Sequence, residues 1–186
     1  MFVLESYTST TKQKGHTLKM KKLQMTIAAL LLVTTVTYAS SEIYLLGGST
    51  DIGASDTMTT YGFGYGGSNS DLSKNTQILY GVNIEFLAAS TKMHSTQAAT
   101  NILLKAGYRH KRLSMYVLGG LLYDGYTGTS SIGLGYGGSV EFDLWRSDVS
   151  SKSIAIGAEY LSASMKNAQD YKYTSDNITG FLKYKW

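Results

Sequence analysis

The chain has 186 residues and a formal net charge of +4, but five of its 17 basic and one of its 13 acidic residues lie before residue 40, which leaves a neutral body with 12 of each. A neutral body has no basic stripe with which to neutralise phosphates, so nucleic acid is excluded as an expected partner. The absence of cysteine excludes disulfide bonds and thiolate metal ligands, and we expect no metal site and no cofactor.

Residues 1–39 are predicted to be a secretory signal peptide, and translation is expected to start at Met20 because residues 1–19 are polar and rich in Ser and Thr. The positively charged start consists of Lys21 and Lys22. An apolar run follows at residues 25–36, and a small-residue cleavage site follows at residues 37–39. The apolar run is shorter than the roughly 20 residues that span a bilayer as a helix. A membrane anchor or a buried helix is the alternative interpretation.

From residue 40 onward the sequence alternates between apolar and polar residues with a period of two, which is typical of strands with two different faces. Residues 132–145 show this best: one face is apolar, and the other carries glycine and polar residues and ends on Trp145. The facing of 42–50 and 113–124 stays ambiguous because apolar residues occupy both parities. We predict eight strands, near residues 42–50, 58–67, 76–88, 99–110, 113–124, 131–145, 153–164 and 176–186.

Eight strands of this length could form a soluble sandwich or a membrane barrel, and two features favour the barrel. The polar face carries mid-strand charges and glycines, as a narrow lumen requires. The apolar face carries aromatic residues that suit interfacial girdles, namely Tyr61, Tyr80, Phe86, Tyr108, Tyr123, Tyr136, Phe142, Tyr160, Tyr184 and Trp186. The predicted fold is all-β: an eight-stranded antiparallel transmembrane up-and-down β-barrel over residues 40–186.

The connections between these strands divide between the two sides of the membrane. With a periplasmic N-terminus, the outer connections fall near residues 51–57, 89–98, 125–130 and 165–175. The periplasmic ones fall near residues 68–75, 111–112 and 146–152.

The end of the chain has the form of a barrel-assembly signal: an aromatic last residue with apolar residues at alternate positions before it. These are Trp186, Tyr184, Leu182 and Ile178, with Gly180 as a gap. Together with the glycine-rich segments YVLGGLLYDGY and GLGYGGSVEFDLW, this ending resembles the eight-stranded outer-membrane barrels of the OmpA-like and opacity-type porin family. The resemblance implies a bacterial outer-membrane protein, monomeric, whose partners are membrane lipids, the barrel-assembly machinery and a host or surface ligand at the outer loops.

The predicted inner face carries a set of charged residues: Glu85, Lys105, Arg109, Glu141, Asp143, Glu159, Lys183 and Lys185. We expect cross-strand pairs between Glu85 and Lys105 and between Glu159 and Lys183. A paired network would plug the lumen, since unpaired charges there would be costly. A gated ion path and a substrate-binding role are the alternatives.

No enzyme is predicted. Small barrels that modify outer-leaflet lipids use His, Ser and an acid, but His94 and Ser95 are adjacent here and His110 lies at a periplasmic turn. The expected function is a non-enzymatic structural or surface-interaction role. A narrow gated channel is the alternative, because eight strands are too few for an open bore. An outer-leaflet lipid-modifying enzyme comes third.

Overall fold

The structure is a computed structural model that describes residues 40–53, 56–90, 97–125, 130–147 and 152–186. The predicted signal peptide (1–39) and the adjacent pair His94 and Ser95 lie outside the described residues. No helix among the described residues is long and apolar enough to cross a membrane.

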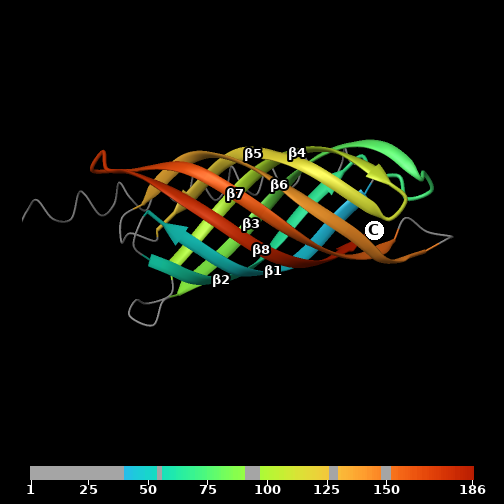
Figure 1. Ribbon diagram of the computed structural model, residues 1–186, viewed down its shortest axis with the longest axis horizontal. Coiled ribbons are helices and arrows are strands. Elements are labelled where there is room, and N and C mark those ends of the chain that lie inside the picture. The colour runs from blue at the N-terminus through green and yellow to red at the C-terminus, as the bar shows by residue number, and fades with distance from the viewer. Residues whose placement is uncertain (1–39, 54–55, 91–96, 126–129, 148–151) are drawn as a thin grey trace, which may run out of the picture. The chain divides into compact units, whose positions relative to one another are not determined.

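Eight antiparallel strands close into one barrel (Figure 1), which confirms the predicted all-β, eight-stranded antiparallel up-and-down barrel. Each strand pairs with its neighbours in sequence, and β1 pairs with β8 to complete the ring. The strands are β1 (Ser40–Ile52), β2 (Asp56–Ser68), β3 (Thr76–Ser90), β4 (Gln97–His110), β5 (Leu113–Asp124), β6 (Ser131–Arg146), β7 (Ser153–Asn167) and β8 (Lys172–Lys185).

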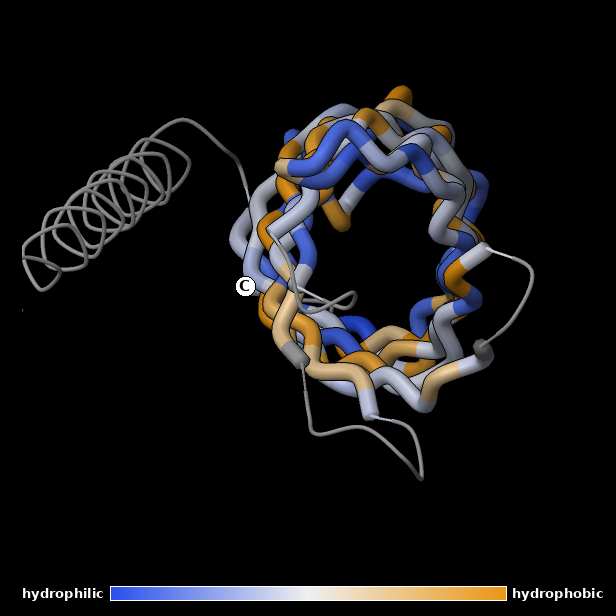
Figure 2. Tube along the Cα trace, turned by 90° about the vertical axis from the view of Figure 1, so that its left-hand side faces the viewer, coloured by the Kyte–Doolittle hydropathy of each residue, from blue (hydrophilic) through white to orange (hydrophobic). Residues whose placement is uncertain are grey.

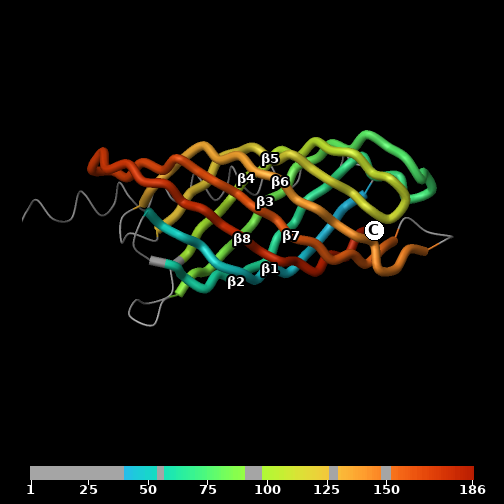
Figure 3. Tube along the Cα trace, viewed as in Figure 1, coloured from blue at the N-terminus to red at the C-terminus, as the bar shows by residue number. Residues whose placement is uncertain are grey.

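The β7–β8 hairpin is longer than the sequence predicts, and it projects from the barrel at the end away from the C-terminus (Figure 3). Its strands stay paired as far as Lys166 and Lys172, so most of the predicted loop at 165–175 is strand. The turn closes because the Asn167 side-chain oxygen accepts the backbone N–H groups of Gln169 and Tyr171, at 2.9 and 3.0 Å. The end of the barrel from which this hairpin projects is called the opposite end. The end where β1 begins and β8 finishes is called the terminal end.

Alternation along each strand separates an outer face from an interior. Figure 2 looks along the barrel and shows a closed ring in which hydrophilic and hydrophobic residues alternate. Large apolar side chains are exposed on the outer face of every strand, for example Leu45, Phe63, Ile78, Leu104, Val117, Leu134, Ile156 and Leu182. The interior buries most of the charged residues of the strands.

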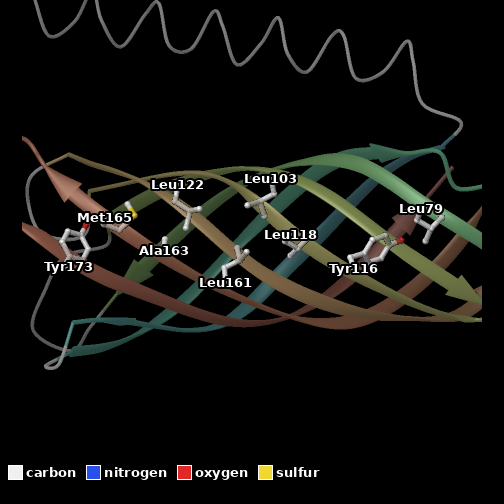
Figure 4. Packing of buried hydrophobic residues seen from close by; sticks show 9 residues of the cluster. All are labelled: Leu79, Leu103, Tyr116, Leu118, Leu122, Leu161, Ala163, Met165 and Tyr173. Atoms are coloured by element: carbon white, nitrogen blue, oxygen red, sulfur yellow. The ribbon is translucent and has the colours of Figure 1, made fainter.

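Apolar side chains also fill much of the interior, which the sequence prediction had described mainly by its charges and glycines. One cluster, drawn in Figure 4, consists of Leu79, Leu103, Tyr116, Leu118, Leu122, Leu161, Ala163, Met165 and Tyr173. A second cluster consists of Tyr44, Leu46, Met58, Leu87, Ala89, Ala99 and Phe181. Both clusters are built from inward-facing residues, so the barrel has a packed core.

The structure corrects the predicted facing of Trp145, which is 48% exposed. The register between β6 and β7 shifts between Asp143 and Trp145. A β-bulge of this kind adds one residue to one strand and reverses the facing of the residues after it. Strict alternation therefore placed Trp145 inside, and the bulge turns it outward.

Candidate functional site

All eight charged residues predicted for the inner face are buried in the barrel. They lie on β3, β4, β6, β7 and β8. Glu85 and Glu159 lie near the middle of their strands, and the other six lie toward the terminal end. The candidate site therefore lies in the interior toward the terminal end, where six of these charged residues are placed.

Glu42 is the functional residue that sequence reasoning missed. It lies near the start of β1 with no exposed surface, opposite Gly66 on β2 and Lys185 on β8. Its Oε1 atom accepts hydrogen bonds from the ammonium groups of Lys105 and Lys183, the latter at 3.2 Å. Glu42 thus joins side chains from three strands.

A second group of ion pairs continues from Lys183 toward β6. Lys183 Nζ lies 2.9 Å from Glu141 Oε2, and Lys185 contacts the other oxygen of the same carboxylate. Arg146 pairs with Asp143 at 2.7 Å, from Nη2 to Oδ2. We call the whole set the ion-pair cluster; it consists of Glu42, Lys105, Glu141, Asp143, Arg146, Lys183 and Lys185.

Aromatic rings hold Lys183 within the cluster. Its ammonium group lies 4.7 Å from the ring centroid of Tyr44 and 4.8 Å from that of Phe181. A cation over a ring face is attracted by the quadrupole of the ring. Lys183 is therefore positioned by two carboxylates and two rings, which fixes the centre of the cluster.

The predicted pairs Glu85–Lys105 and Glu159–Lys183 are wrong. Lys105 lies opposite Gly81, four residues from Glu85, and Lys183 lies opposite Ala155, four residues from Glu159. Four residues of strand span about 13 Å, too far for a direct ion pair. Two residues on neighbouring strands therefore form a pair only where the register also places them opposite or nearly opposite each other.

Glu85 accepts hydrogen bonds from two neutral side chains in the middle of the barrel and also contacts the carboxyl group of Glu159. The Tyr44 hydroxyl donates to its Oε1 at 2.9 Å, and the Asn101 side-chain amide donates to its Oε2 at 3.0 Å. Tyr44 thus links Glu85 to Lys183, because its ring also faces that ammonium group. The interaction continues the polar network from the ion-pair cluster to the barrel centre.

Gly64 makes room for Tyr44, and this leads to a testable prediction. A Cβ atom at Gly64 would lie 2.2 Å from Cζ of the Tyr44 ring. We expect Gly64→Ala to displace the ring and to lower the free energy of unfolding by about 1–3 kcal/mol. Urea titration followed by gel mobility of the folded form measures this loss.

Gly47 supplies the matched control for that variant. It lies on the outer face of β1, where an added Cβ would meet no atom within 4 Å. Gly47→Ala should therefore leave the unfolding midpoint close to that of the unmodified protein. Equal midpoints for the two alanine variants would contradict the close packing of Tyr44 on Gly64.

The turn between β2 and β3 covers the terminal end of the interior. Leu72 and Ser70 in this turn are buried, and Arg146 donates to the Leu72 carbonyl at 3.1 Å and to the Lys111 carbonyl at 2.7 Å. Within the turn, hydrogen bonds from the Ser73 hydroxyl and backbone N–H lower the pKa of Asp71. Arg146 therefore connects the ion-pair cluster to the segment that closes this end.

Of the ten residues predicted for the aromatic girdles, eight are exposed on the outside, and Phe86 and Tyr123 are half-buried. Phe86 stacks on Phe63 with ring centroids 5.1 Å apart. A first group lies toward the terminal end and consists of Tyr80, Tyr108, Phe142, Tyr184 and Trp186, and a second group lies toward the strand centres or the opposite end and consists of Tyr61, Phe86, Tyr123, Tyr136 and Tyr160. The predicted placement near strand ends fails for Tyr160, which lies at the centre of β7 (Ser153–Asn167).

On β7 and β8 the strand surface beyond the second group of aromatics is polar. The outward-facing residues there are Ser162, Ser164 and Lys166 on β7 and Lys172 and Thr174 on β8. The apolar part of the outer surface therefore ends before these strands do.

The four residues of the predicted assembly signal lie on or next to the outer face of β8. Ile178 and Leu182 are exposed, and Tyr184 stacks on Trp186 with ring centroids 5.7 Å apart. The Trp186 backbone N–H donates to the carbonyl of Ser41 at 3.0 Å. The last residue is thus tied to the first strand, at the seam where the barrel closes.

The described residues offer no arrangement typical of a metal centre. His110 is exposed at the end of β4, opposite Thr76. No group of three or more His, Asp or Glu side chains in the described segments is placed to hold a metal ion. Comparison of the chain with protein-family models and with curated proteins finds no match.

Proposed function

We propose that residues 40–186 form an integral outer-membrane barrel that is non-enzymatic and electrically closed, with a structural or surface-interaction role. The observation that carries the proposal is the inverted distribution of side chains. Charged residues are buried inside, while Val117, Leu134 and Tyr136 are each 71% exposed outside. Soluble monomers rarely expose contiguous apolar surface of this extent, whereas a lipid-facing barrel needs it.

Closure of the sheet supports the membrane setting. Every strand has a partner on both sides, so the barrel has no open edge. Lipid cannot satisfy unpaired backbone groups, which restricts spanning structures to helices and closed barrels. The polar outer surface of the β7–β8 hairpin then suits a segment that projects from the bilayer into water.

The filled interior supports the closed state. The first apolar cluster extends along the interior from Leu79 and Tyr116 to Tyr173 (Figure 4), and the ion-pair cluster and the β2–β3 turn add side chains at the terminal end. An eight-stranded barrel is just wide enough for its own side chains. Under this proposal the charged residues stabilise the fold and do not conduct.

The surface role is assigned to the opposite end. The tip of the β7–β8 hairpin exposes Tyr171, and Lys166 and Asp170 form an exposed ion pair at 2.7 Å. Polar side chains and an exposed ring are typical of a surface that contacts other molecules. Loss of binding to cells or matrix after deletion of residues 168–171, with the barrel still folded, would support this assignment.

Planar-bilayer conductance of residues 40–186, refolded in detergent, tests the closed state. Gel mobility before and after boiling serves as the folding control, and a wide porin in the same bilayer shows that channels are detectable. We expect the folded barrel to be electrically silent. Discrete steps that change in size when Glu42 is replaced by glutamine would instead identify the ion-pair cluster as a gate and the protein as a narrow channel.

A further inference from the structure

Arg109 is a buried cation whose charge the described residues leave unbalanced. It lies on β4 with no exposed surface. Its Nε donates to the Ser114 hydroxyl at 3.2 Å, but its Nη1 and Nη2 atoms have no hydrogen-bond partner in the described part of the chain. A buried charge without a partner carries a desolvation cost of several kcal/mol. A bound anion would offset this cost by pairing with the guanidinium group.

No carboxylate of the described residues forms an ion pair with Arg109. Glu42, Glu141 and Asp143 are shared among the four bases of the ion-pair cluster, so positive charge already exceeds negative there. Glu85 faces Asn101, which is eight residues, or about 26 Å, along β4 from Arg109. Glu159 contacts the carboxyl group of Glu85 in the middle of the barrel and forms no ion pair with Arg109.

Two further buried donors without partners in the described residues lie on segments next to the end of β4 that carries Arg109. Tyr116, whose buried hydroxyl has no partner in the described residues, follows Ser114 by two residues on the inner face of β5. Ser70, whose buried hydroxyl likewise has none, lies in the β2–β3 turn, beside the start of β3 that pairs with the end of β4. Figure 4 shows the Tyr116 hydroxyl pointing toward Leu79, which lies two residues after Gln77, the residue of β3 opposite Arg109.

We propose that Arg109 binds a small inorganic anion inside the barrel, with the hydroxyl groups of Tyr116 and Ser70 as additional donors. The guanidinium supplies two N–H-bearing atoms in one plane, and hydroxyl groups can rotate to donate. Ser70 and Leu72 of the β2–β3 turn are buried at this end of the interior, so we propose a small anion and use chloride as the probe. The site is independent of whether the barrel conducts or contacts a partner.

Chloride-dependent stability tests this site. Residues 40–186 refolded in uncharged detergent are unfolded in urea at constant ionic strength, while chloride replaces gluconate, a much larger organic anion. Above saturation, binding to the folded form alone lowers the unfolding equilibrium constant about tenfold for each tenfold rise in chloride. Arg109→Met should abolish this dependence. Arg112→Met is the matched control, because Arg112 is an exposed arginine three residues away, and it should keep the dependence.

A second measurement on the unmodified protein covers the case in which Arg109→Met does not fold. Chloride-35 NMR lines broaden when the ion exchanges with a site on a large particle, so the folded barrel should broaden the line beyond the same barrel unfolded in urea. Equal broadening for both states would overturn the proposal. So would a chloride dependence that persists in Arg109→Met, since the ion would then bind elsewhere. Equal stability in chloride and gluconate would show that water alone occupies the site, which also overturns it.

Discussion

Replacing Glu42 by glutamine is expected to be among the most damaging single changes in the barrel, with a loss of about 3–5 kcal/mol in the free energy of unfolding. The reason is the position of Glu42 between two buried ammonium groups. Lys183 would retain Glu141, at 2.9 Å, but Lys105 has no other carboxylate within ion-pair distance in the described residues. Removing the Glu42 charge therefore leaves Lys105 buried and uncompensated.

The measurement is a urea titration of the refolded barrel, read by gel mobility and by tryptophan fluorescence. Asp71→Asn is the control, because it removes an exposed pair with Lys74 at 3.6 Å, and exposed pairs contribute at most about 1 kcal/mol. The double variant Glu42→Gln with Lys105→Met removes both charges and should recover part of the loss. A cost below about 1 kcal/mol for Glu42→Gln would show that the ion-pair cluster does not depend on Glu42.

The position of Glu42 illustrates where the sequence pattern is informative and where it is not. In β6, apolar and polar residues alternate from Ile132 to Leu144, and the facing predicted from this pattern matches the burial. In β1, Tyr44, Leu45 and Leu46 are consecutive, so neither parity is polar. The inner face of β1 could not be recognised, and Glu42 was missed with it.

Contacts across the interior could not be predicted without the register of the strands, and no local sequence pattern encodes that register. A pair such as Glu42 and Lys105 joins β1 to β4 across the barrel, and no pattern within either strand predicts it. The predicted partners Glu85 and Lys105 do lie on neighbouring strands, but the pairing of β3 with β4 separates them. The bulge after Asp143 was likewise not predictable from the alternation of β6, because its extra residue appears only in the pairing of β6 with β7. Strands and faces were thus predictable, whereas long-range pairing was not.

Val117→Arg distinguishes a barrel in lipid from a barrel in water. Val117 lies at the middle of β5, on the outer face, between the exposed residues Met115 and Leu121. An arginine on the lipid face of a barrel costs about 2–4 kcal/mol near the bilayer midplane, because the charge is removed from water. We expect a loss of this size when the variant is refolded into phospholipid vesicles and titrated with urea.

Thr174→Arg is the matched control for that change. Thr174 is also exposed and faces outward, but it lies on β8 in the polar segment beyond the aromatic residues, where the proposed membrane has ended. Its cost should be close to zero, since charged residues near the interface are tolerated. If Val117→Arg proved as harmless as Thr174→Arg, the apolar surface of β5 would face water, because surface substitutions in a soluble protein usually change stability by less than about 0.5 kcal/mol. A depth-dependent cost, large at Val117 and small at Thr174, requires a nonpolar layer around the middle of the barrel.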